Sequence, residues 1–102
     1  MPSFDYAGLA LPIPDAMRAA HRRAWERLAA PGAWWTGAER VAIAAEVRAS
    51  RTCALCHERK AALSPHALAG EHAAAGGLPA PAVEAAHRIA SDPGRLTHAW
   101  YD

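Results

Sequence analysis

The chain has 102 residues, a formal net charge of +1 and an apolar share of 52%. This length suits one domain and is too short for two independent cores. Because basic and acidic residues are interspersed, the chain offers no basic surface for nucleic acid or an anionic membrane, and both are excluded as expected partners.

Alanine dominates the apolar residues, and this composition limits the core. The chain has 28 alanines, but Leu, Ile, Val and Phe together number only 15. Alanine favours helix but buries little apolar area. We therefore expect an ordered helical chain with a thin core, which a second copy of the chain, a cofactor or a metal would complete. A homo-oligomer is the first expectation.

The N-terminal part predicts an extended arm followed by a helix. Residues 1–14 contain three prolines and sustain no period. From Asp15, which we expect to be the N-cap, apolar residues recur at spacings of three and four until the Pro31-Gly32 break. We place a single all-helical domain at residues 15–102.

The middle of the chain predicts two further helices. The stretch "TGAE", Thr36–Glu39, has the form of a capping box and would start a helix ending near Ala49. Ser50 or Thr52 would cap the next helix, which begins at or just before Cys53 and continues to the Ser64-Pro65 step. The cysteines would then lie in a first helical turn.

The C-terminal part predicts one more helix of substantial length. This helix would have Pro81 near its first position. One of its faces would be lined by Val83, Ala86, His87 and Ala90. We expect His87 to be a core histidine there. Asp92 offers a cap for a last short turn. No segment reads as a strand, so the predicted fold class is all-α.

The chain's only two cysteines lie in "RTCALCHERK", Arg51–Lys60. Residues three apart on a helix share a side, so Cys53 and Cys56 can form a disulfide or share a metal. A helix N-terminus and nearby cationic side chains stabilise thiolate, which favours reactive thiols. In the general scheme the more exposed N-terminal cysteine attacks and the second resolves the mixed disulfide.

The stretch "WTGAERVAIAAEVRASRTCALCHERKAAL" resembles the core of the carboxymuconolactone decarboxylase and AhpD-like alkylhydroperoxidase superfamily over about residues 34–63. The resemblance implies an all-helical fold, assembly as trimers or hexamers, and a dithiol that reduces hydroperoxides without a cofactor. It also implies that Cys56 is the peroxidatic thiol and Cys53 the resolving one, the reverse of the general scheme. An external dithiol would then regenerate the pair.

The sequence departs from this family at two positions of its proton relay. The relay glutamate corresponds to Val41 here, and the relay histidine corresponds to Lys60. We name Glu46 and His57 as candidate substitutes, so the candidate catalytic residues are Cys53, Cys56, His57 and Glu46.

Two other interpretations of the cysteine pair remain open. In the first, Cys53, Cys56, His66 and His72 hold zinc, with the spacing C-x2-C-x9-H-x5-H. In the second, Cys53, Cys56 and His57 form a c-type haem attachment motif. Either would make the chain a non-catalytic metal- or haem-binding interaction module. The N-terminus lacks the features of a secretory signal, and we expect a cytoplasmic protein.

Overall fold

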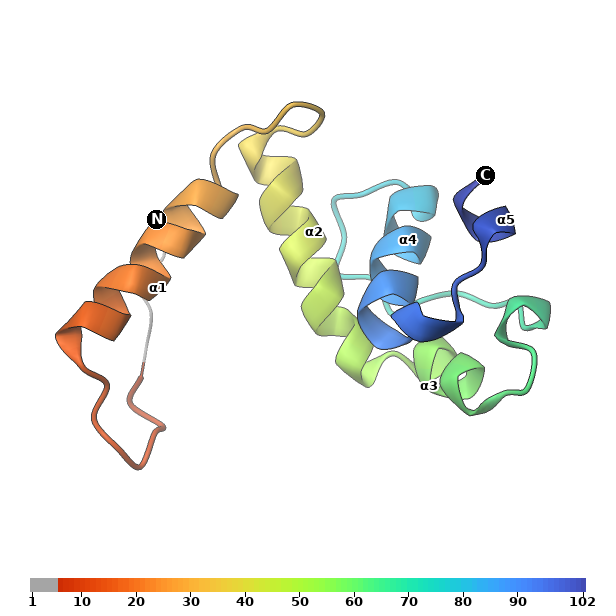
Figure 1. Ribbon diagram of the computed structural model, residues 1–102, viewed down its shortest axis with the longest axis horizontal. Coiled ribbons are helices and arrows are strands. Elements are labelled where there is room, and N and C mark those ends of the chain that lie inside the picture. Colours follow the sequence, from red (N-terminus) through yellow and green to blue (C-terminus); the bar gives the residue numbers. More distant parts are fainter. Residues whose placement is uncertain (1–5) are drawn as a thin grey trace. The chain divides into compact units, whose positions relative to one another are not determined.

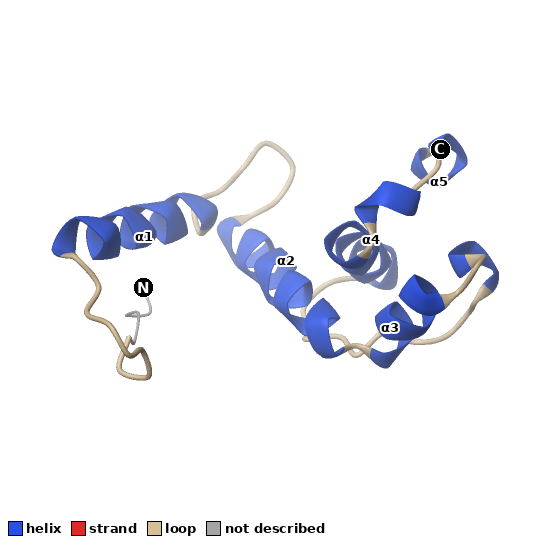
Figure 2. Cartoon of the chain, turned by 60° about the horizontal axis from the view of Figure 1, so that its bottom comes forward, coloured by secondary structure: helices blue, strands red, loops and turns tan. Residues whose placement is uncertain are grey.

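The structure is a computed structural model that describes residues 6–102, and it is all-helical over that range. Its helices are α1 (Asp15–Leu28), α2 (Gly37–Ala49), α3 (Ala54–Ala61), α4 (Ala80–Ser91) and α5 (His98–Tyr101) (Figure 1). Short 3-10 turns lie at Ser50–Thr52, Pro65–Ala67 and Pro93–Arg95. The 3-10 turn at Ser50–Thr52 follows α2 directly, and no strand occurs in the described range (Figure 2). The predicted all-α fold class is confirmed.

The chain divides into two compact units, with the boundary between Arg40 and Val41. The first unit contains α1 and the start of α2. The arm predicted for residues 1–14 falls partly on residues 1–5, which lie outside the described residues, and residues 6–14 form turns and bends without a helix. None of the 14 residues of α1 is buried.

In the first unit, the predicted N-terminal capping is confirmed at one helix and wrong at the other. The capping box at α2 is confirmed, because the Thr36 and Glu39 amides each donate to the other residue's side chain, at 2.9 and 3.1 Å. The prediction of Asp15 as N-cap is wrong. Pro14 occupies that position and Asp15 is the first helical residue, where a carboxylate still favours the positive helix end.

The second unit, Val41–Asp102, holds the core and the candidate site. In this unit α3 packs against α4 and against the two 3-10 turns that flank it. The buried apolar residues of the core are Cys53, Leu55, Cys56 and Val83, which is a small set. The largest fully buried side chains are His87, Glu46 and Cys53, so polar groups fill much of the interior.

The ends of α3 are set differently from the predicted ones. Neither Ser50 nor Thr52 caps this helix, because both belong to a 3-10 turn and Cys53 is the N-cap. The helix ends at Ala61, before the predicted Ser64-Pro65 step. Arg95 explains the early end, since its guanidinium donates to the carbonyl oxygens of Arg59, Lys60 and Ala62. The Arg59 carbonyl also accepts from the Ala62 amide at 3.2 Å, and Arg95 supplies further donors to the carbonyl groups at this helix terminus.

Candidate functional site

Both cysteines are buried at the start of α3. Cys53 is the N-cap residue with 0% exposure, and Cys56 lies one turn later with 3% exposure. They approach to 3.7 Å and form no disulfide. The Ala73 amide donates to the Cys53 sulfur at 3.3 Å. The predicted placement is confirmed for Cys56, which lies in the first turn of α3, whereas Cys53 is the residue just before the helix.

Two imidazoles complete a four-residue group that we call the Cys/His cluster: Cys53, Cys56, His72 and His87. His72 Nδ1 lies 3.5 Å from the Cys53 sulfur and 3.6 Å from the Cys56 sulfur. His87 Nδ1 lies 3.3 Å from the Cys56 sulfur. Each member can offer one ligand atom, and all four atoms lie within 4.8 Å of one another. The cluster can therefore hold a single metal ion or move protons between thiols and imidazoles.

His87 forms the inner pair of the site with Glu46, and both side chains are fully buried. His87 Nε2 donates to Glu46 Oε1 at 2.8 Å, and the Ala75 and Gly76 amides donate to Oε2 at 2.8 and 3.1 Å. Burial alone would raise the pKa of the Glu46 carboxyl, but these hydrogen bonds outweigh burial and lower it. The pair thus keeps a carboxylate behind His87 and directs Nδ1 at the thiols.

His72 forms the outer pair with Glu84, and this pair reaches the surface. His72 Nε2 donates to Glu84 Oε2 at 2.7 Å, and Glu84 is 35% exposed. Arg59 donates to the other carboxylate oxygen at 2.6 Å. Burial again opposes ionisation, but the bonds from His72 and Arg59 lower the pKa of Glu84. Like the inner pair, it leaves Nδ1 as the nitrogen that faces sulfur.

The two thiols differ in acidity because their donors differ. Burial would raise the pKa of Cys53, but donors that include the Cys56 and Ala73 amides lower it to about 6. Burial raises the pKa of Cys56 to about 11, and the negative charge on Cys53 adds to this effect. Since the two groups interact, these values describe a pair that holds one negative charge near neutral pH.

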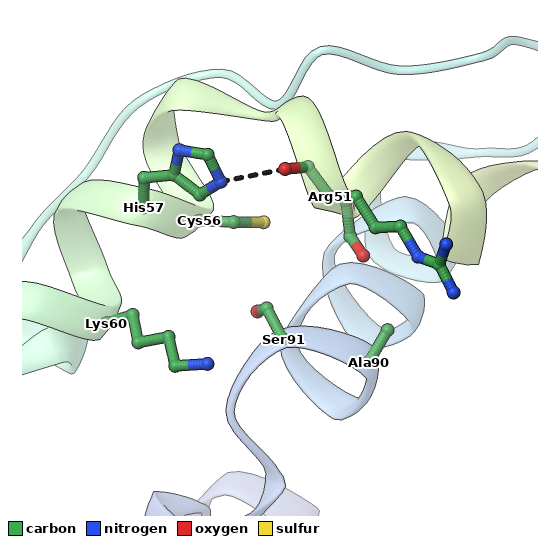
Figure 3. Close-up of a pocket in the computed structure, with 7 residues that line it drawn as sticks. Arg51, Cys56, His57, Lys60, Ala90 and Ser91 are labelled. Carbon is green, nitrogen blue, oxygen red and sulfur yellow. Dashed lines mark hydrogen bonds between the residues drawn. The ribbon is translucent and has the colours of Figure 1, made fainter.

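A small cavity borders the cluster on the Cys56 side. Its volume is about 260 Å³, and its lining includes Cys56, His57, Lys60 and Ser91 (Figure 3). Cys53 is not among the lining residues. Cys56 is therefore the thiol next to a space that can admit a small molecule. Lys60 lies at the same cavity.

The residues named from sequence separate into two groups. Glu46 reaches the cluster through His87, and His72 is a member of it. His57 is exposed, and its Nε2 donates to the Arg51 carbonyl at 2.8 Å (Figure 3). His66 lies outside the cluster, with its ring nitrogens near Arg88 and the Arg95 carbonyl.

Sequence reasoning did not place His87 or Glu84 at the site. His87 was expected on the apolar face of its helix, and its complete burial agrees with that position. What the sequence did not indicate is its acceptor, Glu46, which lies 41 residues earlier. One signal was present: a histidine on an apolar face needs a buried partner, and Glu46 was already a candidate.

Comparisons with known proteins identify no relative of this chain. No family model matches the chain, and no curated protein or solved structure matches it at a significant level. Within the described part of the chain, no helix combines the length and apolar character needed to cross a membrane. The site geometry therefore carries the functional argument.

Proposed function

We propose that Cys53 and Cys56 are a redox-active dithiol that reduces a small electrophile of the hydroperoxide class, in the manner of the AhpD-like proteins that the sequence resembles. The observation that carries the proposal is the chain of contacts from Glu46 through His87 to Cys56, with Cys53 only 3.7 Å from Cys56. A nucleophile, a base within hydrogen-bond reach and a group that orients the base are the elements of an activated thiol.

Cys56 is the attacking thiol in this proposal, because it lies at the cavity and contacts His87. His87 Nδ1 takes the proton of the Cys56 thiol while the sulfur attacks the distal oxygen of the hydroperoxide. The O–O bond breaks, Cys56 becomes a sulfenic acid, and the alkoxide leaves as an alcohol with the proton from His87. Glu46 stabilises the transient imidazolium.

Cys53 completes the reaction as the resolving thiolate. Its sulfur attacks the sulfur of the Cys56 sulfenic acid, a disulfide forms, and the departing hydroxide becomes water with a proton from solvent. One hydroperoxide is reduced by two electrons, and the two cysteines lose two electrons. An external dithiol returns the pair to its reduced form, as the resemblance implies.

The test is alkylation mass spectrometry on metal-free, reduced protein before and after one equivalent of hydroperoxide. We expect the loss of two alkylatable thiols and a disulfide between Cys53 and Cys56. In Cys53→Ser a sulfenic acid should accumulate at Cys56, where a dimedone-type reagent traps it. If both thiols stay alkylatable, or oxidation stops as unlinked sulfinic acids, the proposal is overturned.

A matched pair of variants tests the role of His87. His87→Gln should slow disulfide formation by about 10²–10⁴-fold, the usual range for a lost general base. His66→Gln changes a histidine that lies outside both the Cys/His cluster and the lining of the cavity, and should leave the rate within about twofold of wild type. Equal rates of disulfide formation in the two variants would contradict the role of His87 as the base.

A further inference from the structure

We propose that the Cys/His cluster binds one zinc ion, with Cys53, Cys56, His72 and His87 as its four ligands and Glu46 and Glu84 as the acceptors that hold the two imidazoles. This goes beyond the redox function and does not rest on it. The ligand pattern is C-x2-C-x15-H-x14-H.

The distances between the four donor atoms approach those of a zinc tetrahedron. Zinc–sulfur and zinc–nitrogen bonds of about 2.3 and 2.05 Å give tetrahedral edges of about 3.8 Å between two sulfurs and about 3.5 Å between sulfur and nitrogen. The cysteines lie 3.7 Å apart, and three sulfur–nitrogen distances are 3.3, 3.5 and 3.6 Å. Since all pairs lie within 4.8 Å, the widest edge must close by only about 1–1.5 Å.

The imidazoles already have the orientation that a zinc site requires. Each Nε2–H donates to a carboxylate oxygen, Glu46 for His87 and Glu84 for His72. A neutral imidazole that donates from Nε2 keeps its lone pair on Nδ1, and both Nδ1 atoms face the sulfurs. Carboxylate–histidine–metal arrangements of this kind fix the ring and raise the basicity of the ligand.

The choice of zinc follows from the donor set and the small core. Two thiolates and two imidazoles in a tetrahedral arrangement suit zinc, and four protein ligands describe a closed structural site. The ion would join the start of α3, the segment between residues 67 and 80, and α4. With only a few buried apolar residues in the second unit, the binding free energy would contribute directly to folding.

The metal-bound and oxidised forms exclude each other. A disulfide between Cys53 and Cys56 offers no thiolate to a metal, and a zinc-bound Cys56 thiolate shares its charge with the ion and is a weaker nucleophile at the cavity. Zinc should therefore slow the reaction with hydroperoxide, and the metal-free dithiol is the reactive form.

The test is metal binding by the full chain, purified in reduced form and stripped of metal. Addition of Zn²⁺ should give one ion per chain by native mass spectrometry and should raise the melting temperature. Addition of Co²⁺ should give the intense visible bands of tetrahedral cobalt and the ultraviolet band of cobalt–thiolate bonds, which Zn²⁺ then removes. Octahedral cobalt spectra, or no bound ion, would overturn the proposal.

Histidine variants identify the ligands. His72→Ala and His87→Ala should each weaken binding by at least about tenfold. His66→Ala and His57→Ala, which change histidines outside the cluster, should bind as wild type does. If His66→Ala has the same effect as His87→Ala, the ligand set is wrong. Because His87→Ala removes a buried group, the cobalt spectrum of the wild-type chain decides the matter if that variant does not fold.

This outcome is separable from that of the redox proposal. Disulfide formation is followed on metal-free protein, and zinc binding is followed on reduced protein without peroxide. A chain that oxidises but binds no ion refutes only the metal site. A chain that binds zinc but forms no internal disulfide refutes only the redox function.

Discussion

The inner pair and the outer pair place the same two groups, a glutamate and a histidine, in different surroundings. Glu46 and His87 are both fully buried, and three hydrogen bonds satisfy the carboxylate. Glu84 is partly exposed and is shared between His72 and Arg59. The inner pair is therefore part of the core, whereas the outer pair reaches the surface, where Glu84 holds the His72 ring in place.

The largest effect should come from removing the inner carboxylate. Glu46→Ala leaves the buried Nε2–H of His87 without an acceptor and removes the acceptor of the amides of Ala75 and Gly76, which are exposed residues. We expect the free energy of unfolding to fall by about 3–5 kcal/mol. Urea unfolding of metal-free protein measures it, with Glu58→Ala as the control, because Glu58 is an exposed residue of α3. A loss below about 1 kcal/mol would contradict the role of the pair in the core.

The second expectation concerns the two thiols that the pairs face. In metal-free reduced protein, the ultraviolet absorbance of thiolate should rise in two separate steps, with apparent pKa values of about 6 and about 11. The first thiolate thus forms well below the ordinary thiol value of 9.0. In Cys56→Ser, the Ala73 amide still donates to Cys53, so the remaining step should stay below that value. A single two-thiol step near 9.0 would refute the asymmetry.

The third expectation tests the loop that holds the inner carboxylate. Gly76 has a φ of 100°, and a Cβ added there would meet nothing within 4 Å, so only the backbone conformation opposes a side chain. Gly76→Ala should cost about 1–3 kcal/mol. Gly94 is equally open but lacks a positive φ, so Gly94→Ala should stay within about 0.5 kcal/mol. Equal unfolding free energies for the two variants would contradict this explanation.

The smallest effect on stability should come from the outer pair. Glu84→Gln keeps an oxygen that can accept from His72 but loses the charge that Arg59 contacts. We expect a loss of at most about 1 kcal/mol in unfolding free energy, with zinc affinity reduced by about 10–100-fold. Calorimetric zinc titration and urea unfolding together measure this. A loss of unfolding free energy as large as that of Glu46→Ala would contradict the difference between the two pairs.

Local signals in the sequence predicted much of the fold. The helical class, the capping box at Thr36 and Glu39, and Pro81 in the first turn of α4 all follow from short-range chemistry that one stretch of chain contains. The early end of α3 does not, because it depends on Arg95, which lies more than 30 residues away.

Part of the candidate site could be predicted from the sequence, again because it follows from short-range signals. Two thiols three residues apart indicate a candidate site in any sequence. Glu46 was a candidate because it is the nearest carboxylate in the preceding helix. The choice among six histidines needed tertiary structure. Spacing favoured His57, His66 and His72, of which only His72 belongs to the cluster. The imidazoles of His57 and His66 bond to backbone carbonyls and to Arg88 instead. His87 joins Cys56 only because α4 packs against α3.

The Ala73 and Gly76 amides belong to a short stretch without helix, yet each donates to a buried member of the site, Cys53 and Glu46 respectively. Amides in such a stretch ordinarily exchange with solvent quickly, so protection at these positions reports on the centre itself. We expect hydrogen exchange at Ala73 to depend on the charge on the Cys53 sulfur, and exchange at Gly76 to depend on the Glu46 carboxylate. The loop thus carries two built-in reporters, one for the Cys53 thiol and one for the carboxylate that holds His87.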